Sequence, residues 1–327
     1  MIERKGNSLR RVFLVLCVAL FLILLPSCAR SPGPSSKPLF VVGSQGVSPG
    51  KFRSPRALAV DLKTGRLYVV DRSGRIQLFD GAGKFLLQWY LPEYEQGQPV
   101  GIAIEKDGNI LVNDSHYHRI LRYTADGSKI LASWGSEGAG PGQFTFGRDV
   151  IVDSEGYVYA GDYGGGNDRI LKFTPDGQLV LEWGGCGEAP GKFQRPQGMT
   201  FELEEHGETL LVADCANHRV QRFTRGGKFL FAFGKAGGGP GEFRYPHSVA
   251  VGSDGSIYVS EWGNNRVQRF DREGHPRGFW GNGGHAEGEL ATPWEVVVGP
   301  NDRLYVADCG NHRVQVFQWP PKNEVHG

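Results

Sequence analysis

The most regular chemical feature of the sequence is an arginine that follows an acidic residue at six places. The arginines are separated by 44, 50, 50, 47 and 47 residues and are Arg75, Arg119, Arg169, Arg219, Arg266 and Arg313. The acids before them are Asp71, Asp114, Asp162, Asp214, Glu261 and Asp308. An active site needs one unique set of residues, whereas a structural device recurs in every repeat. We therefore expect each pair to fix a loop through charge-assisted hydrogen bonds, and we do not expect a catalytic ring.

Histidine precedes the arginine in every second repeat, at His118, His218 and His312. Three histidines can form a zinc site, but zinc needs nitrogen ligands at about 2.1 Å. Neighbouring strands lie about 4.8 Å apart, so loops on repeats about 120° apart around a ring are on the order of 20 Å from one another. We therefore expect these histidines to make local loop contacts and not to share a metal.

A further group of residues, at the start of the first expected strand of each repeat, differs between the repeats. Its members are Arg56, Val100, Arg148, Gln197, His247 and Trp294. In a ring of repeats these positions lie near the axis, and ligand sites favour concave places with a few convergent polar groups. All of them except Val100 suit an anionic or carboxylate-bearing ligand, because arginine can contact such a group through two hydrogen bonds. The alternative is a water-filled channel mouth with an ordinary polar lining.

The elements that must position these residues follow from the repeat itself. A period of about 40 to 50 residues with several short strands predicts a β-propeller. In the fifth repeat we expect strands at 247–252, 256–260, 266–271 and 275–281, with Asp254-Gly255 forming the first tight turn. Four antiparallel strands make one blade. The sequence thus predicts an all-β, six-bladed propeller of four-stranded blades over residues 38–319.

The two ends of the repeat array predict how the ring closes. The sixth repeat has only three expected strands, and a lone strand at 39–43 precedes the first repeat. We expect this strand to pair with the last blade, which leaves no exposed edge. Large apolar residues also recur before the first strand and at the end of the fourth, and we expect them to pack between blades. They are Phe52, Phe144, Phe193, Phe243 and Leu290, and Trp134, Trp183, Phe233 and Trp280.

The stretches DCANHRVQRF at 214–223, WGNNRVQRF at 262–270 and DCGNHRVQVF at 308–317 resemble the NHL-repeat family of six-bladed propellers. The resemblance covers 38–319, where the pattern recurs in register six times. It implies the propeller fold and four-stranded NHL-type blades. It does not imply one activity, because propellers serve as enzymes, binding modules and structural hubs.

Two enzymatic resemblances can be tested against the first-strand positions. The NHL-like amidating lyases bind zinc through three histidines, each directly after a proline at such a position; here Pro246-His247 matches one, and two ligands are absent. Lactonase-like hydrolases hold a divalent cation through carboxylates that face the channel. Asp149 and Glu295 stand next to Arg148 and Trp294, but strand alternation predicts that only one residue of each adjacent pair faces inward.

The N-terminus carries the features of an export signal. Basic residues are followed by an apolar run at 12–25, which is shorter than the roughly 20 residues of a membrane-spanning helix. The ending Leu25-Pro26-Ser27-Cys28 resembles a bacterial lipoprotein signal, in which Cys28 becomes the lipidated first residue. We therefore expect a signal peptide at 1–27, a flexible Ser- and Pro-rich tether at 28–37, the propeller at 38–319 and a tail at 320–327. The alternatives are an uncleaved anchor and ordinary signal cleavage nearby.

Composition narrows the partners and the redox chemistry. The chain has 36 basic and 35 acidic residues and a formal net charge of +1, which argues against nucleic acid, because binding it needs a basic face. An exported protein can form disulfides, so Cys186 and Cys215 are either bridged or, together with Cys309, free thiols. We expect a binding scaffold in the bacterial cell envelope for a protein or a small anionic ligand. The alternative is a metal-dependent hydrolase or lyase with calcium or zinc in its channel.

Overall fold

The computed structural model describes residues 37–95, 98–204 and 207–318. The expected signal peptide, Cys28, nearly all of the tether and the tail at 320–327 lie outside these residues. Among the residues that are described, no helix is long and apolar enough to span a bilayer.

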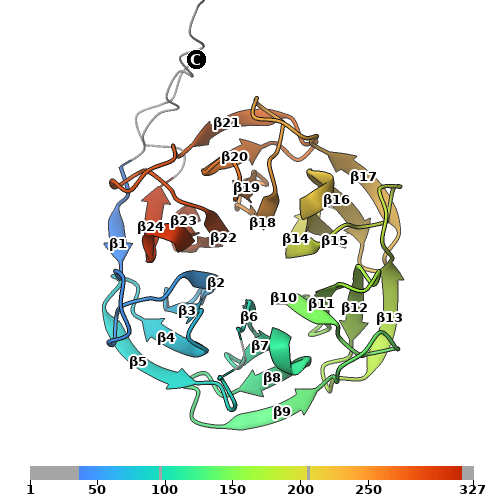
Figure 1. Cartoon of the computed structure of the whole chain (residues 1–327), viewed down its shortest axis with the longest axis horizontal. Helices are drawn as coiled ribbons and strands as arrows, with labels where there is room; N and C mark the ends of the chain where they lie inside the picture. Colours follow the sequence, from blue (N-terminus) through green and yellow to red (C-terminus); the bar gives the residue numbers. More distant parts are fainter. Residues whose placement is uncertain (1–36, 96–97, 205–206, 319–327) are drawn as a thin grey trace, which may run out of the picture. The chain divides into compact units, whose positions relative to one another are not determined.

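Six four-stranded antiparallel sheets are arranged around a common centre, as Figure 1 shows. The first sheet contains β2 (Pro55–Val60), β3 (Leu67–Asp71), β4 (Arg75–Phe79) and β5 (Phe85–Tyr90). The second contains β6 (Gly101–Ile104), β7 (Ile110–Asp114), β8 (Arg119–Tyr123) and β9 (Ile130–Trp134). The third contains β10 (Phe146–Val152), β11 (Val158–Tyr163), β12 (Arg169–Phe173) and β13 (Leu179–Gly184).

The remaining three sheets continue the same order. The fourth contains β14 (Pro196–Glu204), β15 (Gly207–Asp214), β16 (Arg219–Thr224) and β17 (Phe229–Phe233). The fifth contains β18 (Pro246–Val251), β19 (Ile257–Glu261), β20 (Arg266–Phe270) and β21 (Pro276–Trp280). The sixth contains β22 (Pro293–Gly299), β23 (Arg303–Asp308), β24 (Arg313–Gln318) and β1 (Phe40–Val42). The six-bladed, all-β prediction is therefore confirmed.

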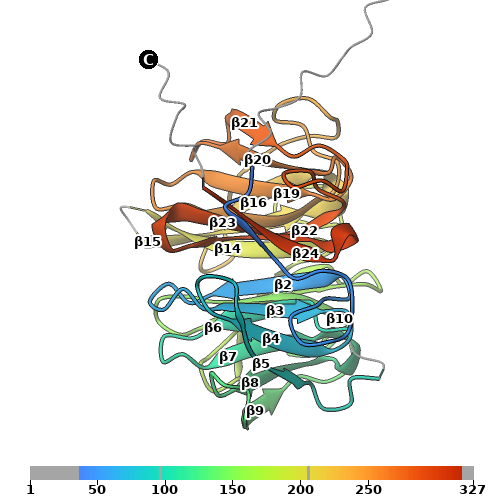
Figure 2. The same ribbon diagram turned by 90° about the vertical axis from the view of Figure 1, so that its left-hand side faces the viewer.

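The ring closes through the N-terminal strand. β1 pairs antiparallel with β24, with Phe40 opposite Val316 and Val42 opposite Val314. Figure 1 shows β1 beside β24, at the outer edge of the last blade, and in Figure 2 the blue N-terminal segment crosses in front of the red strands of that blade. The strand from one end of the chain thus occupies the place that the fourth strand takes in every other blade, as the sequence predicted.

Apolar packing lies between consecutive blades. The residues before the first strands, Phe52, Phe144, Phe193, Phe243 and Leu290, are fully buried. The aromatic residues that end the fourth strands contact rings on the next blade: Trp134 lies 6.4 Å from Phe173 between ring centroids, and Trp183 lies 6.2 Å from Phe223. The prediction that these aromatics pack between blades is confirmed.

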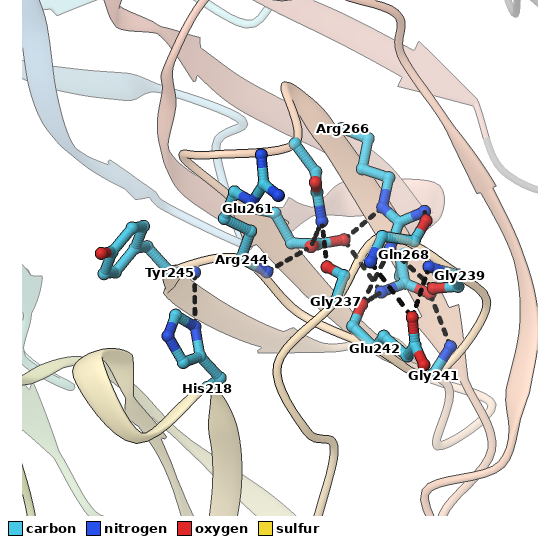
Figure 3. A network of polar contacts seen from close by, with 12 residues as sticks. His218, Gly237, Gly239, Gly241, Glu242, Arg244, Tyr245, Glu261, Arg266 and Gln268 are labelled. Carbon is cyan, nitrogen blue, oxygen red and sulfur yellow. Dashed lines mark hydrogen bonds and ion pairs between the residues drawn. The ribbon is translucent and has the colours of Figure 1, made fainter.

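The acid and arginine pairs fix the loops before the first strands. Figure 3 shows the fifth blade, where Arg266 pairs with Glu261 and donates to the carbonyl oxygens of Gly238, Gly239 and Glu242 at 2.8 to 2.9 Å. The other five pairs also form, with N–O distances of 2.7 to 3.6 Å. Their role is structural, because each guanidinium ties the loop between two blades to the blade that follows.

The three histidines each bridge to the loop of the next blade. The Nδ1 atoms of His218 and His312 accept hydrogen bonds from the backbone N–H groups of Tyr245 and Ser54 at 3.2 and 3.0 Å. His118 Nδ1 lies 3.0 Å from the carbonyl oxygen of Phe144. The expectation of local contacts is thus confirmed.

Candidate functional site

The inner strands of all six blades start on the same side of the propeller. In the fifth blade Pro246, the first residue of β18, pairs with Glu261, the last residue of β19. The start of the inner strand therefore lies beside the loop that carries the acid and arginine pair. We call this side the loop face. The opposite side carries the tight turns between first and second strands, and we call it the hairpin face.

Irregularities in the inner strands change which side chains point into the channel. The register of β10 against β11 shifts between Gly147 and Val150, and that of β22 against β23 shifts between Pro293 and Val296. As a result Arg148 and Asp149 line the same narrow cavity, and so do Trp294 and Glu295. The expectation that only one residue of each pair faces inward is therefore wrong, because a bulge breaks the two-residue alternation of a strand.

The residues selected from the sequence come together at the loop-face end of the channel. His247 and Trp294 line a cavity of about 360 Å³ together with Arg195, Cys215, Tyr245 and Trp262. Arg148, Gln197, His247 and Trp294 line the narrower cavity below it. The guanidinium of Arg56 stacks over the Trp294 ring, 4.8 Å from its centroid. We call Arg56, Arg148, Arg195, Gln197, His247 and Trp294 the cup.

Arg148 is the most unusual charge in the cup. Its exposed fraction is 9%, and its Nε atom is buried without a hydrogen-bond partner. In the part of the chain that the structure describes, its one close partner is the ring of Tyr163, whose centroid lies 4.8 Å from the guanidinium carbon. Burial, with the nearby charges of Arg195 and Arg56, lowers the pKa of Arg148 to about 10. The side chain remains charged at neutral pH.

Three guanidinium groups act on one histidine. Burial, followed by the charges of Arg148, Arg195 and Arg56, lowers the pKa of His247 well below its usual value. Its ring packs against Trp294 with 4.0 Å between centroids. At neutral pH the imidazole is therefore uncharged and the positive potential of the cup comes from arginine, which favours a negatively charged ligand.

Arg195 and Tyr245 were not identified from the sequence, although both line the cavity. Each directly precedes the proline that opens an inner strand, and each has a left-handed backbone with φ of 56°. The sequence did contain a signal for these two residues, because the residue before the first strand also differs between blades. Trp262 and Cys215 were missed for another reason: they lie on loops between second and third strands, and only the curvature of the ring brings them to the mouth.

Two buried carboxyl groups lie on the hairpin side of the cup. Asp149 accepts hydrogen bonds from the backbone N–H groups of Val150 and Met199 at 2.8 and 2.7 Å. Glu295 accepts one from the Ser248 hydroxyl at 2.7 Å. Burial raises the pKa of Asp149 to about 7, and burial together with the charge of Asp149 raises that of Glu295 well above its usual value. Burial thus makes both carboxyl groups harder to ionise than they are in water, and the charge of Asp149 adds to this effect at Glu295.

The three described cysteines are free thiols in the structure, so the Cys186–Cys215 disulfide is not formed. Cys186 is exposed on the loop before β14 and interacts with Asp168. Cys215 is buried at the channel mouth beside Arg195. The two side chains thus have different partners. Two cysteines on the same face of the propeller do not have to be close enough to form a disulfide.

The described side chains offer one group of potential metal ligands, and it does not include a residue of the cup. In the described residues, the one group of three potential ligands whose atoms lie within 4.8 Å of one another is Asp271, Glu273 and His275, which follows β20. In the cup, only His247 matches the histidine positions expected for an amidating lyase. Gln197 and Trp294 occupy the equivalent positions on the neighbouring blades. The cup residues therefore do not fit that zinc site.

A family model for the NHL repeat matches residues 243–270 and 290–317, which are the fifth and sixth blades. The chain therefore matches the NHL repeat in these two blades. Together with the six four-stranded blades, this match agrees with the resemblance on which the fold was predicted. The carbonyl-binding arginines Arg266 and Arg313 lie inside the two matched stretches.

Curated relatives match parts of this chain. Peptidylglycine alpha-amidating monooxygenase of Rattus norvegicus is 30% identical over 46% of this chain and 15% of its own length. A probable peptidyl-alpha-hydroxyglycine alpha-amidating lyase of Caenorhabditis elegans is 30% identical over 46% of this chain and 40% of its own. NHL repeat-containing protein 3 of Mus musculus is 28% identical over 44% and 45%. The matches cover less than half of each relative.

Solved structures share the fold. A streptogramin B lyase structure has a TM-score of 0.58 at 14% identity and covers 85% of this chain and 97% of its own. A chain in a nidogen/laminin complex has a TM-score of 0.57 at 20% identity, with 74% and 84% covered. At these identities the similarity concerns the fold alone.

Proposed function

We propose that this chain is an NHL-repeat propeller that binds an anionic ligand, or an acidic group of a partner protein, in the cup on its loop face. The observation that carries the proposal is the buried guanidinium of Arg148, which has no carboxylate partner among the described residues. A buried charge is costly unless it is paired and hydrogen-bonded. An anion in the cup would supply the missing acceptor.

The composition of the cup supports the same ligand class. Arg148 and Arg56 can offer planar forks of N–H donors, which match carboxylate and phosphate groups. Gln197 Nε2 and Arg56 Nε are also buried without a hydrogen-bond partner. The cavity of about 360 Å³ falls within the size range of small-ligand sites and has aromatic walls at Tyr245 and Trp262.

The binding proposal is tested by titrating the mature protein with acetate, benzoate and inorganic phosphate in a calorimeter. We expect at least one anion to bind, and we expect Arg148→Gln to weaken that binding by at least about tenfold, because a charge-assisted contact is lost. Arg66→Gln is the matched control, since Arg66 is exposed near the hairpin face. Equal affinities in the wild type and Arg148→Gln would exclude the cup as the anion site.

The same proposal places the protein outside the cytoplasm, attached to a bacterial membrane by a lipid on Cys28. It rests on the basic, apolar and cysteine-containing order of residues 1–28. The test is membrane fractionation of cells that express Cys28→Ser. The variant should appear in the soluble fraction or keep its signal peptide, and a mature variant that stays with the membrane would contradict the lipid anchor.

A second candidate function is a lyase or hydrolase, which the 30% identity to two amidating enzymes favours. The cup does not fit the three-histidine zinc site, so we derive no catalytic step from it. Elemental analysis of the purified protein distinguishes the candidates. About one tightly bound calcium or zinc ion per chain would favour an enzyme, whereas its absence would favour the binding module.

A further inference from the structure

A second cavity opens from the opposite side of the channel and shares only Asp149 and Glu295 with the narrow cavity of the cup. It has a volume of about 340 Å³ and lies between the inner strands β2, β6, β10, β14, β18 and β22. Most of the side chains that line it are apolar, among them Ala59, Met199, Phe201 and Val251, and polar atoms of the strand backbones lie between them. These residues follow the cup positions along the inner strands, so the cavity lies toward the hairpin face.

The rim of this cavity exposes large apolar side chains. Leu62 lines the cavity and has an exposed fraction of 67%. Leu203, at 72%, lies with Leu62, Phe201 and Val298 along an adjoining hollow. Exposed apolar side chains around a concave place are typical of surfaces that bind an apolar molecule. The walls and the rim together therefore suit an apolar body.

The inner end of the same cavity is formed by Asp149 and Glu295, each of which is less than 10% exposed. Both oxygens of Asp149 accept backbone hydrogen bonds. Glu295 Oε1 accepts the Ser248 hydroxyl, and no described residue forms a hydrogen bond with the second oxygen, Oε2. A carboxyl group with a free oxygen at the end of an apolar cavity provides one strong, localised site for a hydrogen-bond donor.

We propose that this cavity binds an aliphatic molecule that ends in one ammonium group, with the ammonium on Glu295 and the alkyl chain along the apolar walls. The ammonium group compensates the carboxylate charges, which are costly to bury unpaired. The alkyl chain of the ligand covers the apolar side chains of the cavity and removes them from water. Two carboxyl groups are fewer than the six to eight oxygen ligands of calcium. The geometry therefore favours an organic cation over a metal ion.

Binding of such a cation requires Glu295 to ionise. The Glu295 carboxyl loses its proton to the solvent, and the resulting carboxylate forms an ion pair with the ammonium group of the ligand. In the narrow cavity with Glu295, β10 contributes Asp149 and Arg148, β18 contributes His247, and β14 contributes the uncharged Gln197. Ser248 of β18 donates to Glu295, and Arg56 of β2 stacks over the ring of the adjacent Trp294. Burial and the charge of Asp149 raise the pKa of Glu295 and therefore oppose its ionisation in the free protein. Affinity should therefore rise with pH until the ligand amine itself loses its proton.

The experiment is calorimetric titration of the mature protein with n-hexylammonium chloride, and with n-hexanol and sodium hexanoate as matched probes. We expect hexylammonium to bind at least tenfold more tightly than either probe. In buffers with different ionisation enthalpies, binding should release a proton. Glu295→Gln should weaken hexylammonium binding at least tenfold and abolish the proton release, while Glu287→Gln, an exposed acid elsewhere, should change neither.

A second variant tests the same cavity without altering the buried carboxyl groups of Asp149 and Glu295. Leu62→Lys places a positive charge on the exposed rim and should weaken hexylammonium binding while hexanol is affected less. Equal affinity for hexanol and hexylammonium, or unchanged binding in Glu295→Gln, would overturn the proposal. So would calcium binding at this pair in the absence of any amine binding.

Discussion

At the scale of single residues, the same charged side chains serve two different purposes. Arg266 is satisfied by Glu261 and by three carbonyl oxygens of the loop before its blade. Arg148 is as deeply buried, yet no described carboxylate or carbonyl group accepts its N–H donors. Because an unpaired buried charge reduces stability, the contrast separates an arginine that stabilises the fold from one that is available to a ligand.

The structural arginines should have a large effect on stability. Replacing Arg266 with glutamine leaves the buried Glu261 carboxylate without its partner, and we expect a loss of about 3 to 5 kcal/mol in the free energy of unfolding. Arg277→Gln is the control, because its pair with Asp271 is exposed and should be worth less than about 1 kcal/mol. Urea denaturation measures both. If both variants lost a similar free energy of unfolding, the contacts of Arg266 with its loop would contribute little to stability.

At the scale of elements, each of the first four blades contacts the next through an aromatic ring and a glycine. Trp134 ends β9, and Gly177, in the turn after β12, lies over its ring. A Cβ atom built at Gly177 would be 2.9 Å from the Trp134 ring, which is closer than real Cβ contacts allow. The turn glycine therefore serves the packing of blades as well as the turn.

Two glycines separate these effects. Gly177 and Gly108 have nearly the same backbone, with φ of 88° and 90°, but nothing lies within 4 Å of a Cβ at Gly108. Both alanine variants should lose stability through backbone strain. Gly177→Ala should lose at least about 1 kcal/mol more, because it also overpacks the Trp134 ring. Equal shifts in thermal denaturation would exclude an effect of the blade contact.

The inner strands also bring two acids together, and this predicts a dependence of stability on pH. The folded-state pKa values of Asp149 and Glu295 are raised, to about 7 for Asp149. The unfolded chain releases these protons near pH 4, so the folded state binds more protons between about pH 4 and 7 and stability falls as pH rises. Glu295→Gln removes one of the two carboxyl groups and therefore makes the fall in stability with rising pH smaller. We expect the variant to gain stability relative to wild type between pH 5 and 8, measured by urea denaturation, and a constant difference would contradict the coupling.

At the scale of the whole molecule, the ring depends on a strand from the opposite end of the chain. β1 contributes the buried Val42 to the core between the last blade and the first. Without β1, the edge of β24 would be exposed and the contact around Phe52 would be open to water.

Deleting residues 38–43 should therefore lower the melting temperature by roughly 10 °C or more, since several kcal/mol of packing and strand pairing are lost. A chain that begins at Lys37 is the reference. An unchanged melting temperature after the deletion would contradict closure through β1.

The sequence by itself determined the blades, the closing strand, the acid and arginine pairs and the aromatics between blades. Each of these depends on local periodicity or on a signal that repeats six times, such as the turn at Asp254-Gly255, so neighbouring residues carry the information. The five site residues could be selected for the same reason, since every repeat shows where its inner strand begins.

Only the tertiary structure decided what these residues face. Bulges in β10 and β22 turn adjacent residues into the same channel, and the ring then brings together Asp149 and Glu295, which stand on opposite blades, the third and the sixth. Arg195 joins Arg148 and Arg56 only because the ring has a common centre. The physical reason is that a bulge breaks the alternation from which facing is predicted, and that the centre of a closed ring is formed by residues far apart in the chain.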